Sequence, residues 1–394
     1  MSAESTASAS GDVLQPVIAG ALAAFVGYAS TFTLILTGLA AVGATDVQAG
    51  SGLLAVVGTI AVLNIVVAWR TRVPIFFAWS TPGAAFLLTA GVPEGGFPAV
   101  VGAFVMTGIM IVLAGVFRPF ARAVAAIPQP IANAMLAGIL LTLCLAPIRA
   151  VEAMPTLALP VILAWAVALR FARRYAVPIA VLVTAIILAT TTSLPAGAFA
   201  FDWPRVEFVA PAFTLDAFLR LSLPLFIITM ASQNLPGLAV LRANGYDVAP
   251  APFFVLTGAA SAVTAMIAAI PVNFAAITAA IGASAEAHPD PARRWVSAFT
   301  GGWTNVGLFF ISGLAAAFVA VSPPLLIQAV AGLALLSSLA SAAGHALGDE
   351  DMRLPAILTF VTTASGVTVL GIGAAFWGLI AGIALMAILR GRLR

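Results

Sequence analysis

Apolar runs of about 20 residues recur from one end of this 394-residue chain to the other. An α-helix of that length crosses the hydrocarbon core of a bilayer, which is about 30 Å thick. Charged residues make up only 8% of the chain, against about a quarter in soluble domains. A transmembrane β-barrel would instead show alternating segments of about ten residues. The sequence therefore predicts an all-α polytopic membrane protein.

The apolar runs divide into fourteen predicted spans, seven on either side of a polar stretch that begins at residue 194. The first seven are 16–41, 47–69, 73–91, 97–117, 127–148, 155–171 and 175–193. The second seven are 216–241, 250–269, 270–287, 295–319, 324–343, 354–370 and 372–389.

Arginine sets the expected orientation, because every basic residue in the chain is arginine. If the N-terminus lies in the cytoplasm and the chain crosses the membrane fourteen times, all arginines except Arg149, Arg205 and Arg220 lie on the cytoplasmic side. This bias matches the excess of basic residues in cytoplasmic loops, so both termini are expected to be cytoplasmic. The basic charge is thereby explained without nucleic acid. The polar N-terminal segment has no basic region before an apolar run, so no cleaved signal peptide is expected.

Two proline-led segments repeat half a chain apart. "VPIFFAWST" at 73–81 aligns with "IPVNFAAIT" at 270–278. Further matches follow in the same order: residues 102–104 match residues 297–299, and residues 130–141 match residues 324–335. These matches predict an internal repeat of 1–193 and 194–394. Since each repeat holds an odd number of spans, the second must enter the membrane from the opposite side, as in the inverted repeats of secondary transporters.

Spans three and ten are predicted to be broken. Pro74 and Pro82 each remove a backbone N–H, and "TPGAAFLLTAG" reads as a helix start with Thr81 as its N-cap. Span ten repeats the pattern with Thr278 as the cap. Extended backbone inside a bilayer needs hydrogen-bond partners, so the two segments are expected to pair as short strands. The alternative is a pair of ordinary proline-kinked helices.

The two half-helices would point their N-termini at the middle of the membrane. Each N-terminus carries unpaired N–H groups and about half a positive charge, so the pair predicts an anion site. The ring side chains beside the caps, Phe77, Trp79 and Phe274, suit a ligand with an apolar body and a charged end. Ordinary packing of these rings is the alternative.

Polar side chains in three other places are candidates to face this ligand. Ser232, Gln233 and Asn234 are adjacent in span eight, where buried polar groups are costly unless they face protein or a cavity. Tyr28 lies in "GYAST" of span one, and Asn273 would meet the polar end of the ligand. Hydrogen bonds that only hold helices together, or plain packing of Tyr28, remain open.

No buried carboxylate stands out as the group that accepts a proton. Glu286, at the end of span ten, is one candidate, although a solvated charge at the cytoplasmic mouth is the favoured interpretation. The single cysteine, Cys144, lies in an apolar run and reads as a packing residue. No catalytic group, metal site or cofactor is predicted, so an enzyme is not expected.

At "ITMASQNLPGLAVLRANGY", residues 228–246, the sequence resembles the benzoate:proton symporter (BenE) family. "GYAST" in span one and "PVNFAAITAAI" in span ten support the resemblance, which runs the whole chain. It implies the architecture of nucleobase:proton symporters and sulfate-type anion transporters. The implied core domain is 16–117 with 216–319, and the implied gate domain is 118–193 with 320–394.

The resemblance also implies a substrate. Nucleobase symporters carry acidic residues on spans eight and ten, whereas "MASQNLPG" and "VNFAAITAA" contain none. A carboxylate there would repel an anion, so its absence favours an aromatic acid. The expected function is import of benzoate or a close aromatic carboxylate with a proton, across a bacterial inner membrane, by a protein that could form a homodimer. The alternatives are a nucleobase or inorganic-anion transporter of the same fold, and an uncoupled anion channel.

Overall fold

The computed structural model describes residues 14–117, 128–191, 205–285, 287–367, 369 and 374–391. The first half of the chain contains α1 (Leu14–Ala41), α2 (Asp46–Thr71), β1 (Phe77–Trp79), α3 (Thr81–Ala90), α4 (Gly96–Val116), α6 (Gln129–Cys144), α7 (Ala146–Ala153), α8 (Pro155–Phe171), η1 (Arg173–Tyr175) and α9 (Ala176–Thr191). The second half contains α10 (Leu215–Ala217), η2 (Phe218–Ser222), α11 (Leu223–Thr229), η3 (Met230–Asn234), α12 (Leu235–Ala243), α13 (Pro250–Ala265), β2 (Val272–Phe274), α14 (Ala276–Gly282), η4 (Pro291–Arg293), α15 (Trp295–Ala320), α16 (Pro324–Leu347), α17 (Arg353–Ala364) and α18 (Ala374–Gly391).

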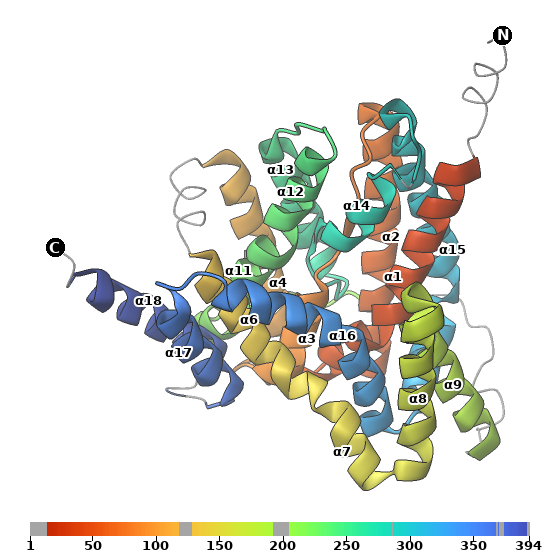
Figure 1. The fold of residues 1–394 in the computed structure, drawn as a ribbon. Coiled ribbons are helices and arrows are strands. Elements are labelled where there is room, and N and C mark those ends of the chain that lie inside the picture. The colour runs from red at the N-terminus through yellow and green to blue at the C-terminus, as the bar shows by residue number, and fades with distance from the viewer. Residues whose placement is uncertain are drawn as a thin grey trace.

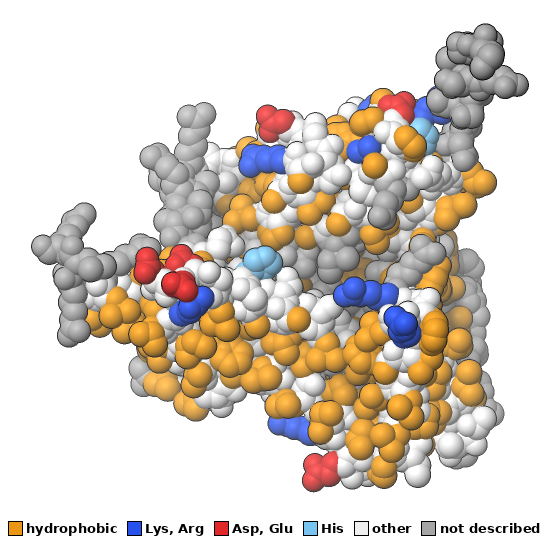
Figure 2. All heavy atoms as spheres, viewed as in Figure 1, with side chains coloured by type: hydrophobic (Ala, Val, Ile, Leu, Met, Phe, Trp, Pro, Cys, Tyr) orange, Lys and Arg blue, Asp and Glu red, His pale blue; other side chains and the backbone are white. Residues whose placement is uncertain are grey.

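The structure is mostly helical, as predicted. Within the described residues, seven helical stretches are long and apolar enough to cross a membrane. They are 14–41, 46–71, 96–116, 129–153, 215–243, 291–320 and 324–347. Shorter apolar helices occupy most of the other predicted spans. Hydrophobic side chains cover most of the described surface in view, with charged ones in small groups between them (Figure 2).

Helices from the two halves of the chain interleave. The main packing partners are α2 with α15 and α4 with α13, so each pair joins one helix from each half. Helix α1 also packs on α15, and α6 packs on α16. In Figure 1, α1, α2, α14 and α15 lie together, while α17 and α18 stand at the opposite edge. The core of the molecule is therefore built jointly by both halves.

Strands β1 and β2 form an antiparallel pair in the two proline-led segments. Phe77 faces Phe274, and Ala78 faces Asn273. Beyond the strand, the Ala275 N–H donates to the Phe76 carbonyl at 2.8 Å. The pair of Phe77 with Phe274 stands at one end of the strands, and these two residues also align in the repeated sequence.

Side chains satisfy the outward edges of both strands. The Asn64 amide of α2 binds the backbone of Phe77 twice, accepting from its N–H at 2.7 Å and donating to its carbonyl at 3.2 Å. The Ser261 hydroxyl of α13 accepts from the Val272 N–H at 2.9 Å. Both side chains are buried. Their hydrogen bonds take the place of those that further strands would supply to a wider sheet. Backbone N–H and C=O groups inside hydrocarbon need such partners.

The half-helices begin at different residues from those predicted. Helix α3 is capped by Ser80, whose hydroxyl accepts from the Gly83 N–H at 3.0 Å, and Thr81 is its first residue. Helix α14 begins at Ala276 without a side-chain cap, which puts Thr278 in its first turn. Threonine was therefore the wrong cap in both segments. Because α14 has seven residues against ten in α3, its dipole is the weaker of the two.

Glycine permits the close crossing of α1 and α15. A Cβ at Gly20 would overlap the backbone carbonyl of Ser297. Gly20→Ala should therefore push the helices apart and cost about 1–3 kcal/mol, the usual penalty for overpacking. Gly307→Ala on α15 is the matched control, because a Cβ there meets no atom within 4 Å. Thermal unfolding of the two purified variants checks this, and equal melting temperatures would contradict it.

Candidate functional site

A cavity of about 320 Å³ lies beside the strand pair, and we name it the strand cavity. Helices α1, α2, α14, α15 and α16 contribute to its wall, together with β1, η1 and η3. Six residues expected from the sequence line it: Tyr28, Phe77, Trp79, Thr81, Gln233 and Thr278. Its volume lies at the small end of the range for small-molecule pockets, which is about 300–1,000 Å³. The cavity therefore suits a small ligand.

Aromatic rings form one wall of the strand cavity. Tyr28 and Trp79 meet edge to face with their centroids 6.3 Å apart. The Trp79 indole N–H donates to the Thr31 hydroxyl at 3.0 Å, and the Tyr28 hydroxyl donates to Ser312 Oγ at 3.3 Å. The polar atoms of both rings are thus bonded to protein, which fixes the rings and leaves apolar ring atoms to line the cavity.

A π-helical turn directs the side chains of the three adjacent polar residues of span eight to different surroundings. Residues Met230–Asn234 form η3, in which each turn holds one residue more than in an α-helix. The Ser232 hydroxyl turns back to the Ile228 carbonyl at 2.6 Å. Asn234 accepts from the Phe274 N–H at 3.0 Å. Only Gln233 lines the cavity, so this turn presents one amide to a ligand and assigns the other two side chains to the scaffold.

Four expected residues do not line the strand cavity: Ser232, Asn234, Asn273 and Phe274. Phe274 packs on Phe77 with ring centroids 5.5 Å apart. Asn273 is fully buried, and in the amide orientation that satisfies its neighbours its oxygen accepts from the Ser80 N–H at 2.9 Å. These positions support the strand pair. Glu286, the candidate proton acceptor, falls outside the described residues.

The cavity also has polar lining residues that the sequence analysis did not single out. They are Asn64, Arg173, Asn305, Ser337 and Ser338, in addition to Ser30 and Thr31 of the expected "GYAST" segment. Arg173 is exposed in the short η1 joint between α8 and α9, and it is the one charged side chain among the described lining residues. In the sequence, an arginine at the end of a span is typical of a topology signal and does not by itself indicate a ligand.

The amide of Gln233 is available to a ligand. The side chain is 8% exposed, and no residue within the described ranges hydrogen-bonds to it. By contrast, Ser80 already satisfies the N–H groups of Gly83 and Ala84 at the start of α3. Backbone donors at this helix start are therefore fewer than the sequence suggested, and side chains carry more of the polar chemistry.

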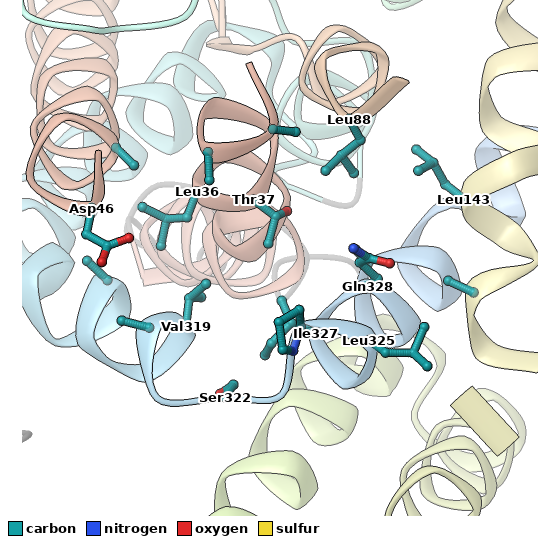
Figure 3. A pocket seen from close by; sticks show the side chains of 18 of the residues that line it. Leu36, Thr37, Asp46, Leu88, Leu143, Val319, Ser322, Leu325, Ile327 and Gln328 are labelled. Atoms are coloured by element: carbon teal, nitrogen blue, oxygen red, sulfur yellow. The ribbon is translucent and has the colours of Figure 1, made fainter. Parts of the chain in front are cut away.

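A second cavity, of about 750 Å³, lies further along the same helices, and we name it the Arg149 cavity. Asp46 and Arg149 are the two charged side chains among its described lining residues. Figure 3 shows Thr37 of α1 and Gln328 of α16 facing the same space. The two cavities thus share walls from α1, α2, α3, α15 and α16.

A small aromatic group separates the two cavities. On α1, the strand cavity is lined up to Thr31 and the Arg149 cavity from Leu36 onward. Phe32 lies between these positions, stacked on Tyr28 at 5.5 Å and 6.2 Å from the Phe318 ring. The hydrogen bond from Tyr28 to Ser312 links α1 to α15 at the same level.

Comparison with known proteins decides the family. The family model described as "Benzoate membrane transport protein", BenE, matches residues 12–388. The chain belongs to the BenE family. Two curated relatives span nearly its whole length. The inner membrane protein YdcO of Escherichia coli (strain K12) is 39% identical over 93% of both chains. The benzoate membrane transport protein of Acinetobacter baylyi (strain ATCC 33305 / BD413 / ADP1) is 30% identical over 94% of both.

Solved structures show the same fold at low identity. SLC26A9 matches with a TM-score of 0.63 and 10% identity, over 95% of this BenE chain and 65% of the longer protein. The transmembrane domain of the cyanobacterial bicarbonate transporter BicA matches with a TM-score of 0.56 and 15% identity, over 96% and 97% of the two chains. This BenE protein is accordingly a membrane transport protein with an SLC26-like fold.

Proposed function

We propose that this BenE protein imports benzoate or a close aromatic carboxylate together with a proton, by alternating access. The observation that carries the proposal is the strand cavity, which combines a wall of fixed rings with the free, buried amide of Gln233. Its volume of about 320 Å³ suits a single-ring acid. The name of the Acinetobacter baylyi relative points to the same substrate.

The acid would lie with its ring among Tyr28, Phe77 and Trp79. Its carboxylate would accept from the Gln233 amide and from donors at the first turns of the half-helices, close to Thr81 and Thr278. Arg173, at the η1 joint, would add positive charge to this cavity. Ser232, Asn234, Asn273 and Phe274 would act indirectly, because they brace or pack the strand pair.

The moving parts would be the two domains implied by the family architecture. The core domain would be 16–117 with 216–319 and the gate domain 118–193 with 320–394, arranged as two inverted seven-span repeats. Both domains contribute to the strand cavity, the core through α1, β1 and η3, and the gate through η1 and α16. A substrate held there would contact both bodies, as alternating access between rigid domains requires.

The two cavities suggest where access would alternate. They lie on either side of Phe32, along helices from both domains. Sliding the core against the gate would open one cavity while closing the other. With cytoplasmic termini, the Arg149 cavity would face the outside and the strand cavity the cytoplasm. The proton acceptor stays a prediction at Glu286, and a homodimer is compatible with the fold.

Uptake into proteoliposomes tests the proposal. We expect an inward proton gradient to drive [14C]benzoate entry, with about tenfold accumulation per pH unit if one proton enters with each anion, since one pH unit is worth about 1.4 kcal/mol. Initial rates must be compared with protein-free vesicles, because neutral benzoic acid crosses lipid unaided. Protein-dependent flux that ignores the gradient would indicate a channel. Protein-dependent uptake of labelled uracil or sulfate, with none of benzoate, would indicate the rival substrates.

A further inference from the structure

Asn305 is a second buried amide in the wall of the strand cavity. It lies on α15 one turn after Gly301, which also lines the cavity. Its side chain is 6% exposed. Trp303, on another face of the same helix, is 55% exposed. Helix α15 therefore presents its aromatic residue to the surroundings and its amide to the cavity.

The amide of Asn305 has no hydrogen-bond partner within the part of the chain that the structure describes. Two other polar side chains near it on α15 have partners: Thr304 donates to the Thr300 carbonyl at 3.0 Å, and Ser312 to the Leu308 carbonyl at 2.9 Å. Buried polar groups are almost always bonded, and an unbonded one lowers stability. A side chain that only holds helices together would be expected to have found a partner.

We infer that Asn305 is a substrate-binding residue and supplies the second amide that holds the transported acid. Gln233 and Asn305 reach the same cavity from different elements, η3 and α15, and both are more than nine-tenths buried. A carboxylate offers two oxygens with about four lone-pair sites, so it can accept from two amides at once. The inference rests on the proposed function, since the ligand is the aromatic carboxylate proposed there.

The inference makes an unusual prediction about stability. Removing a hydrogen bond to a charged group should weaken binding about tenfold or more. Removing an amide that is unbonded in the empty protein should leave the melting temperature unchanged or raised. Asn305→Ala should therefore lose affinity without losing stability. If Asn305 only held helices together, replacing it would lower the melting temperature of the empty protein.

The test measures benzoate binding by calorimetry and thermal unfolding of the empty protein, both on the purified full chain. Asn305→Ala is compared with Thr304→Ala, which removes a neighbouring polar group that does not line the cavity. We expect at least about a tenfold rise in Kd for the first and a change within about twofold for the second. Asn305→Asp keeps the shape but replaces the donor with a negative charge, so it should bind still more weakly. It also gives the readout if the alanine variant is not recovered folded.

The outcomes separate this inference from the proposed function. If the wild type binds neither benzoate nor its hydroxylated analogues, the proposed function fails and the role of Asn305 fails with it. If the wild type binds but Asn305→Ala and Asn305→Asp bind equally well, only the role of Asn305 is overturned. A fall in the melting temperature of the empty protein, with unchanged Kd, would mark Asn305 as structural.

Discussion

Gln233→Ala should abolish proton-driven benzoate uptake while leaving the protein folded. Gln233 is the one residue of the polar trio in span eight that lines the strand cavity, and its amide is not used by the scaffold. Its loss removes a donor to the carboxylate from a buried position, where a lost hydrogen bond to a charged group is costly. Initial uptake rates in proteoliposomes, together with size-exclusion profiles and melting temperature, check both parts of this expectation.

The matched control for Gln233 is Asn244→Ala. It also removes one amide, but that amide donates to the Val240 carbonyl at the end of α12, away from both cavities. We expect near-normal uptake from this variant. Normal uptake by Gln233→Ala would show that the substrate is held elsewhere.

Asn64→Ala should cost both stability and transport. Asn64 satisfies the N–H and the carbonyl of Phe77, and it is 2% exposed. Each buried backbone group left unbonded costs about 1–3 kcal/mol, so a loss of about 3 kcal/mol is expected. Since Phe77 and Trp79 line the cavity from β1, uptake should fall even in molecules that stay folded. Thermal unfolding and uptake by the same preparation check this.

Two further variants define the contribution of Asn64. Thr59 lies on the same helix, and its hydroxyl donates to the Ala55 carbonyl of that helix. Thr59→Ala should therefore change the melting temperature and the uptake rate very little. Asn64→Asp keeps an acceptor for the Phe77 N–H but loses the donor to the carbonyl, so its effect should be intermediate. Asn64→Ala variants as stable as Thr59→Ala would refute the bracing role.

The broken segments were predictable because proline and a repeated motif marked them. Two of their aligned residues, Phe77 and Phe274, face each other in the strand pair. The caps were harder to place. Ser80, Thr81 and Pro82 follow one another, and both hydroxyl residues can cap a helix, so local rules do not distinguish a helix that starts one residue earlier.

The polar lining was less accessible to sequence reasoning. An α-helix keeps adjacent residues about 100° apart whatever their identity, whereas the π-turn at Met230–Asn234 redistributes three polar side chains among different partners. Nothing in the local composition marks that extra residue. Asn305 did carry a signal, as a lone asparagine inside an apolar run. It lies outside the polar trio and the repeated segments, the features that marked the other candidates.

The pairing of β1 with β2 also constrains how the molecule is made. The two strands are 197 residues apart, so β1 is synthesised long before its partner exists. During that interval Asn64, only thirteen residues away, is the nearby group that can satisfy the Phe77 backbone. Contacts between such distant segments form late, after the cost of closing the loop has been met. The strand cavity is therefore completed only when the second half of the chain has been synthesised, and until then the first half carries an unpaired strand edge.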